Sequence, residues 1–168
     1  MALTFEELYE RHFQDVHRFA LWLSGDPAEA DDVASETFVR AWVRRDRLRT
    51  ETLKGYLMAI ARTVFVDRRR KARTTAPLPA SLKDDAPGPH REMSARSDLR
   101  QVRRAMAWLR ELDRAALILR AEQEMAYAEI ARVLGISEGA ARVRVHRARR
   151  RLLDVFLESS GDCNGSDT

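Results

Sequence analysis

A single proline-rich stretch divides an otherwise helix-patterned sequence. Four of the five prolines fall within residues 77–89, and proline inside a helix removes a hydrogen bond and clashes with the preceding turn. The surrounding segment, residues 74–97, has no helical spacing and few apolar residues, so we predict a flexible linker. The 168-residue chain therefore divides into modules at residues 1–73 and 98–157, each near the lower limit for independent folding. The small, polar tail at residues 158–168 is expected to be disordered.

Apolar residues recur at three- and four-residue spacing in both modules, which is typical of one face of an α-helix. In the first module this spacing predicts helices over about residues 5–23 and 52–70, with another helix between them. That middle helix has a strong start, because Asp26 can act as its N-cap and Pro27 suits the first helical position. Val, Ile and Thr do not alternate with polar residues, as they would in strands. We therefore expect an all-α fold of two small helical domains.

The second module ends in a helix-turn-helix pattern. Asp98 and Asp113 are predicted to cap two helices. A short helix at residues 127–134 follows and is stopped by Gly135. A longer, basic helix is then predicted over residues 137–157. A short helix, a glycine-containing turn and a longer basic helix are typical of DNA-binding domains.

Composition excludes several classes of protein. One cysteine and four scattered histidines argue against a disulfide framework or a Cys-rich zinc site. No phosphate-binding glycine motif or converging catalytic set occurs, so we expect no enzyme and no cofactor. No apolar run is long enough to cross a membrane, and the N-terminus does not resemble a signal peptide, which favours a cytoplasmic protein without membrane insertion. Cys163, alone in the tail, is interpreted as an inert thiol rather than a redox sensor.

Charge is distributed unevenly along the chain. Residues 1–45 hold nine acidic and five basic residues, a net charge of −4. Residues 46–73 hold three acidic and nine basic residues, a net charge of +6, and residues 139–151 hold six arginines and no acid. One such basic cluster is most simply a solvated helix face. Two clusters, each at the end of a helical pattern, favour a polyanionic partner, with nucleic acid first.

The last predicted helix, SEGAARVRVHRARRRLLDVF, carries the clearest signal. Small residues near its start would let the backbone approach DNA closely, and arginine can bind guanine with both arms. A solvated arginine face would normally be balanced by acids one turn away, but no acid occurs between Glu138 and Asp154. The residues expected to pack inward are Val143, Ala148, Leu152, Val155 and Phe156.

Three motifs together resemble one family. YAEIARVLGISEGAARVRVHRARRRL resembles region 4 of bacterial sigma factors, and both PAEADDVASETFVRAW and GYLMAIARTVFVDRRRK resemble region 2. Two modules and one linker resemble the extracytoplasmic-function (ECF) group of the sigma-70 superfamily, over roughly residues 5–73 and 98–157. The resemblance implies a non-enzymatic factor that binds core RNA polymerase, reads the minus-ten and minus-thirty-five promoter elements and helps to melt DNA. Many relatives are held inactive by an anti-sigma factor, which the resemblance makes a plausible partner here.

The resemblance assigns roles in the first module. The second helix would dock on the clamp helices of the polymerase largest subunit. Its acidic strip has no basic partner nearby in sequence, which leaves it free for a basic partner, although the two aspartates also suit a helix N-terminus. Phe38 and Trp42 are expected in the core. The docking residues would be Asp31, Asp32, Glu36 and Arg40.

The third helix would read and open the minus-ten element, bind the melted non-template strand and contact phosphates. Residues 46–53 would form the pocket loop for a flipped base. Asp67 matches the aspartate of the family pattern I-A-R-x-x-x-x-D, but it can equally bond a nearby arginine. Thr63 stands where many relatives have Asn, which leaves the base preference open. The minus-ten residues would be Lys54, Arg62, Thr63, Asp67, Arg68 and Arg69.

In the second module, the last helix would enter the major groove of promoter double-stranded DNA. Arg142 and Arg144 are expected at base edges and Arg147 at phosphate. Ala126 stands where relatives usually have a capping Ser, and Ala140-Ala141 lack hydroxyls that relatives use. The minus-thirty-five residues would be Ser137, Gly139, Ala140, Arg142, Val143, Arg144, His146 and Arg147.

Two other functions remain open from the sequence. A helix-turn-helix repressor or activator could act without polymerase, but it has no need for an acidic helix beside a melting helix. A protein-interaction module that has lost its DNA functions would not be expected to keep arginine on both predicted DNA faces.

Overall fold

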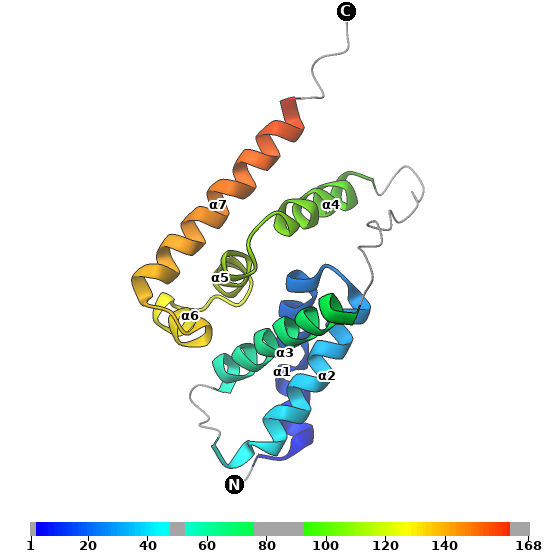
Figure 1. The fold of residues 1–168 in the computed structure, drawn as a ribbon, viewed down its shortest axis with the longest axis vertical. Coiled ribbons are helices and arrows are strands. Elements are labelled where there is room, and N and C mark those ends of the chain that lie inside the picture. The colour runs from blue at the N-terminus through cyan, green and yellow to red at the C-terminus, as the bar shows by residue number, and fades with distance from the viewer. Residues whose placement is uncertain (1–2, 48–52, 76–92, 162–168) are drawn as a thin grey trace, which may run out of the picture.

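A computed structural model describes residues 3–47, 53–75 and 93–161. Every regular element in these ranges is helical, which confirms the predicted all-α class. The predicted linker lies mostly outside the described residues: positions 74 and 75 end one helix, and positions 93–97 begin the next. The elements, shown in Figure 1, are α1 (Phe5–Ser24), α2 (Pro27–Val43), the short 3-10 helix η1 (Arg45–Arg47), α3 (Leu53–Thr75), α4 (Met93–Ala107), α5 (Glu111–Ala121), α6 (Tyr127–Leu134) and α7 (Glu138–Gly161).

Local capping explains where the first two helices begin. The Thr4 hydroxyl accepts from the Glu7 backbone N–H at 3.2 Å, and the Glu7 carboxylate accepts from the Thr4 N–H at 3.0 Å, a reciprocal capping box. The predicted Asp26 cap is confirmed, since its carboxylate accepts from the Ala28 N–H at 2.9 Å. Between the two helices, Gly25 takes a left-handed φ of 70°, which favours glycine.

Helices α1, α2 and α3 form the N-terminal module. Phe19, Phe38 and Phe65, one from each helix, are almost fully buried at its centre. The predicted core position of Phe38 is confirmed, whereas Trp42 is only partly buried and packs edge-on against Phe5 at 5.5 Å between ring centroids. The three helices therefore pack their apolar faces around a common core.

Helices α4 to α7 form the C-terminal module, in which α5 lies at the centre and α7 extends along α4 (Figure 1). The predicted cap at Asp98 is wrong, because α4 begins at Met93 and Asp98 lies inside it. The predicted cap at Asp113 is also wrong: Arg110 occupies the N-cap position of α5, and Asp113 is a buried residue of its first turn. Asp113 still suits the helix dipole in the first turn of α5, whereas Asp98 lies beyond the first turn of α4.

The turn between α6 and α7 follows the sequence prediction. Gly135 takes a left-handed φ of 65° at the end of α6, and the Ser137 hydroxyl accepts from the Ala140 N–H at 3.1 Å. Ala126 makes no side-chain cap, as expected, and the Glu129 carboxylate accepts from its N–H at 3.2 Å instead.

Helix α7 is rotated relative to the prediction. Val143 was expected to pack inward, but it is 54% exposed, whereas Ala141 and Val145 are fully buried. Ala148 is also buried and Leu152 partly buried, as predicted. The stripe formed by these four positions has the three- and four-residue spacing of a helix face packed on a core.

The two modules contact each other along α1 and α3 on one side and α5 and α6 on the other (Figure 1). The Gln123 side chain, buried after α5, donates to the Asp15 backbone carbonyl at 3.3 Å, and Arg18 pairs with Glu122 at 3.0 Å. Buried apolar residues of both modules belong to one continuous cluster. Within the described ranges, no helix is both long and apolar enough to cross a bilayer.

Candidate nucleic-acid and polymerase interfaces

The N-terminal half of α7 presents most of the predicted minus-thirty-five residues to solvent. Only Ala140 and Arg144 of that set are half-buried. The exposed members are Ser137, Gly139, Arg142, Val143, His146 and Arg147. The exposed face therefore alternates small, apolar and cationic side chains over three turns of helix, a surface that fits a groove of DNA.

Arg142 is exposed but held in place. Its guanidinium donates to the Glu138 carboxylate at 2.8 Å, one helical turn away, and its central carbon lies 4.7 Å from the centre of the Tyr127 ring. Arg142 therefore reaches solvent from a fixed position rather than as a free chain.

Arg144 differs from the expected base-edge role. Its guanidinium donates at 2.8 Å to Asp113 of α5, a carboxylate that is only 3% exposed. The second oxygen of Asp113 lies 3.8 Å from Arg147. A carboxylate removed from water needs such a partner, so Asp113 ties the middle of α7 to α5 and directs Arg144 toward the protein.

The acidic strip on α2 is not free of basic partners, which corrects the sequence prediction. Arg68 of α3 donates to both oxygens of Glu29, at 3.0 and 3.3 Å, and to Asp32 at 2.8 Å. It also lies 3.9 Å from Glu36. Hydrogen bonding by Glu29 is the main cause that raises the pKa of Arg68 above its ordinary value. Sequence spacing could not show this pairing, because the partners lie more than 30 residues apart.

Two further docking residues are also paired. Arg40 donates to Glu36 and, at 3.4 Å, to Asp67 of α3, so the alternative in which Asp67 bonds a nearby arginine is the one observed. Asp31 is exposed and lies 2.9 Å from the His17 ring nitrogen. Asp32, Glu36 and Arg40 therefore form a network of both charges with α3 rather than a bare acidic strip, whereas Asp31 faces α1.

Apolar residues missed by the sequence analysis flank this network. Val39 is 59% exposed and Val43 is 73% exposed on α2. Their signal was available, because they fall outside the apolar stripe that contains Phe38 and Ala41. The two valines lie one helical turn apart, so they form a small apolar patch with a charged rim, which is the arrangement of a protein–protein interface.

Two basic residues of α3, Arg62 and Lys54, are paired with carboxylates. The Arg62 guanidinium donates two hydrogen bonds to the carboxylate of Glu111 on α5, at 2.8 and 2.9 Å. Lys54 forms an ion pair with Asp15 at 3.2 Å. Thr63 is exposed and its hydroxyl donates to the Ala59 carbonyl. The predicted pocket loop lies mostly outside the described residues.

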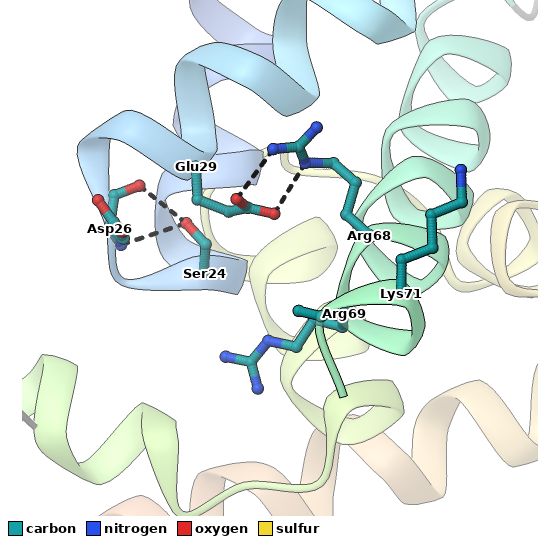
Figure 2. A pocket seen from close by; sticks show the side chains of 7 residues that line it. Ser24, Asp26, Glu29, Arg68, Arg69 and Lys71 are labelled. Atoms are coloured by element: carbon teal, nitrogen blue, oxygen red, sulfur yellow. Dashed lines mark hydrogen bonds and ion pairs between the residues drawn. The ribbon is translucent and has the colours of Figure 1, made fainter. Parts of the chain in front are cut away.

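An open hollow of about 430 Å³ lies at the C-terminal half of α3, against the turn between α1 and α2. Figure 2 shows the Arg68 guanidinium directed at Glu29, whereas the Arg69 side chain points away from this pair. The Arg69 guanidinium instead lies 5.2 Å from the centre of the Phe65 ring. Arg69 and Lys71 are exposed at the rim and leave this end of α3 positively charged.

Arg114 of α5 marks the boundary between the modules. It is buried, and one arm donates to the Met106 carbonyl at 3.2 Å. Burial is the main cause that lowers its pKa, the charge of Arg69 lowers it further, and Glu111 opposes both. Glu111 therefore faces cations from both modules. Among the described residues, no cluster of three or more His, Cys, Asp or Glu could hold a metal ion.

Comparisons with known proteins agree with this geometry. The sigma-70 region 2 family matches residues 8–75, and the sigma-70 region 4 family matches residues 99–152. The ECF RNA polymerase sigma factor SigL of Mycobacterium tuberculosis is 32% identical over 155 residues, covering 90% of this chain and 88% of its own. The ECF RNA polymerase sigma factor SigM of Bacillus subtilis is 29% identical, covering 95% of this chain and 99% of its own.

Solved structures match across both modules. The structure of CnrH in complex with the cytosolic domain of CnrY has a TM-score of 0.69 at 26% identity, over 92% of this chain and 88% of that one. The sigma factor RpoE in complex with the anti-sigma factor NepR from Bartonella quintana has a TM-score of 0.72 at 24% identity, over 91% and 96%. The chain belongs to the ECF subfamily of sigma-70 factors, non-enzymatic proteins that direct RNA polymerase in transcription initiation.

Proposed function

We propose that the exposed face of α7 reads the minus-thirty-five element, that α3 contacts the minus-ten element, and that α2 docks on core RNA polymerase, all in the cytoplasm. The observation that carries the proposal is the N-terminal half of α7, where four side chains are exposed to solvent: Arg142, Val143, His146 and Arg147. Arginine at base edges distinguishes guanine from other bases, and arginine at phosphates supplies affinity.

Run-off transcription with purified core polymerase and genomic promoter fragments tests the whole proposal. Transcripts should appear only when this protein is added. DNA binding without core polymerase and no gain in transcription would favour a repressor or activator that acts alone. If the protein neither binds DNA nor supports transcription with core polymerase, a protein-interaction module would be favoured.

Docking is best tested at Val39, because charge reversal at Glu36 would also disturb its pairs with Arg40 and Arg68. Val39→Glu should weaken capture of core polymerase, since Val39 is 59% exposed and its loss leaves the core intact. Gln14→Glu, which adds the same charge at an exposed site on α1, is the matched control. Equal capture by both variants would remove this side of α2 from the docking surface.

The proposed minus-ten contacts are Lys54, Arg62, Thr63, Asp67, Arg68 and Arg69. Arg68 and Arg69 should act differently, because Arg68 already holds three carboxylates and Arg69 points away from them. Arg69→Ala should reduce promoter opening, measured by permanganate reactivity of unpaired thymines, with little change in stability. Arg68→Ala should lower stability as well. Normal reactivity in Arg69→Ala would exclude Arg69 from the contact.

An anti-sigma factor is the third proposed partner. The contacts between the modules support it, because they hold Arg62, a proposed minus-ten contact, on Glu111. A partner that binds the closed form better than the open form would hold the factor inactive. Co-purification of partners from cells, with an Arg62→Ala variant that weakens closure as the control, tests for such a partner.

A further inference from the structure

Tyr127, the first residue of α6, lies between two arginines from other helices. The guanidinium carbons of Arg120 on α5 and Arg142 on α7 are each 4.7 Å from the centre of its ring. Both distances are within the range in which the electron-rich ring face attracts a cation. Three helices of the C-terminal module therefore meet at one aromatic ring beside the proposed base-reading side chain.

The ring itself is held rigidly. Tyr127 is partly buried and packs against the apolar core. Arg120 is anchored, because one of its arms donates to the Met125 carbonyl at 3.0 Å, in the turn that leads into α6. Arg120 thereby fixes both the turn and one contact of the ring.

Arg142 gains the most from this support. Its side chain is 59% exposed, and an exposed arginine in many rotamers loses conformational entropy when it binds a base. Side chains held in advance in their bound position bind more tightly because that entropy is already lost. Glu138 also holds Arg142 but neutralises it, whereas an uncharged ring holds the cation and leaves its charge available to DNA.

We propose that Tyr127 is a positioning residue that sets the base specificity of Arg142. This inference rests on the proposed role of Arg142 in reading a base edge of the minus-thirty-five element. The ring touches the arginine and holds it, so its effect on DNA passes through Arg142 alone.

The test uses polymerase holoenzyme and a promoter library randomised over the minus-thirty-five element. Arg142→Ala should relax base discrimination at one base pair of the element. Tyr127→Leu should relax that same base pair by about 3-fold, on the scale of an exposed cation–π contact, and leave the other positions unchanged. Tyr127→Phe, which keeps the ring, should retain most of the discrimination. Adding Tyr127→Leu to Arg142→Ala should cause no further relaxation, since a positioning residue has no effect without the side chain that it positions.

Each other outcome overturns the inference. Equal weakening at all positions by Tyr127→Leu would mean that the ring only stabilises the module. Tighter binding would mean that the ring competes with DNA for Arg142. If Arg142→Ala relaxes discrimination at one base pair but Tyr127→Leu does not, the inference about Tyr127 is wrong and the base-reading role of Arg142 stands. If Arg142→Ala relaxes no base pair, the base-reading role of Arg142 is wrong as well. If Tyr127→Leu does not fold, Tyr127→Met supplies a second side chain without a ring.

Discussion

Replacing Glu111 by Gln should open the two modules. Glu111 accepts two hydrogen bonds from Arg62 across the boundary, and both side chains are largely shielded, at 27% and 24% exposed. An exposed ion pair is worth about 0.2–1 kcal/mol, whereas a hydrogen bond to a charged group reaches about 1.5–3 kcal/mol. The Arg62–Glu111 pair has two hydrogen bonds and intermediate exposure, so it should stabilise closure by about 1–2 kcal/mol. That corresponds to roughly a 5- to 30-fold change in the closed-to-open ratio.

The loss should fall at the upper end of that range. Glu111 also opposes the mutual repulsion of Arg114 and Arg69, which lie on opposite sides of the boundary. Without the Glu111 carboxylate, Arg62 adds a third cation that has lost its counter-charge. Raising the salt concentration should narrow the difference between the variant and the parent, because salt screens exposed charges.

The distance between the modules is measured by energy transfer between two dyes, one attached at position Glu10 on α1 and one at position Arg149 on α7. Both positions are exposed, and Cys163 is replaced by Ser. Glu122→Gln is the matched control, since Glu122 also pairs across the boundary but with an arginine that is 59% exposed. It should open the modules less than Glu111→Gln. An unchanged distance in Glu111→Gln, or a larger effect in the control, would refute the reasoning.

Three further outcomes are expected. Asp113→Asn should lower the free energy of unfolding by about 2–4 kcal/mol in urea titrations, because it removes a buried carboxylate that holds Arg144; a loss below 1 kcal/mol would contradict this role. Burial is the main cause that lowers the pKa of His12 below 6.5, so the unfolded chain binds that proton more readily and stability should fall as pH drops below about 6.5. His12→Gln should flatten this pH dependence, and an unchanged slope would exclude His12 as its source. Asp26→Ala should cost about 1 kcal/mol in thermal unfolding followed by circular dichroism, because it removes the α2 cap.

The sequence predicted the features that depend on near neighbours. The caps at Asp26 and Ser137 and the glycine turn at Gly135 were correct, because each depends on residues within one helical turn. Val143 was placed inward because it is apolar. The observed stripe instead runs through Ala141, Val145 and Ala148, which follow one another at four- and three-residue spacing, whereas Val143 lies five residues before Ala148 and so falls outside it.

Long-range pairs could not be predicted from spacing. Arg62 and Glu111 are 49 residues apart, and Arg144 and Asp113 are 31 apart. Which charges meet depends on how the helices pack, and sequence patterns alone do not fix that packing. Arg68 was therefore read as free for DNA, although it bonds the very carboxylates that were expected to be unpaired.

These pairs determine how the factor's affinity for DNA should depend on salt. An arginine that leaves a carboxylate for a phosphate exchanges one anion for another, so it adds little net affinity. Counterions are released from DNA only in proportion to the positive charge newly brought to it. Arg62 and Arg68 already hold carboxylates, whereas the run Arg149–Arg151 is exposed and has no ion-pair partner within the described ranges. The salt dependence should therefore follow the unpaired cations near the ends of the two helices, Arg149–Arg151 of α7 and Arg69–Lys71 of α3, more than the paired Arg62 and Arg68. If Arg62 contacts the minus-ten element as proposed, opening of the modules should change specificity there more than overall affinity.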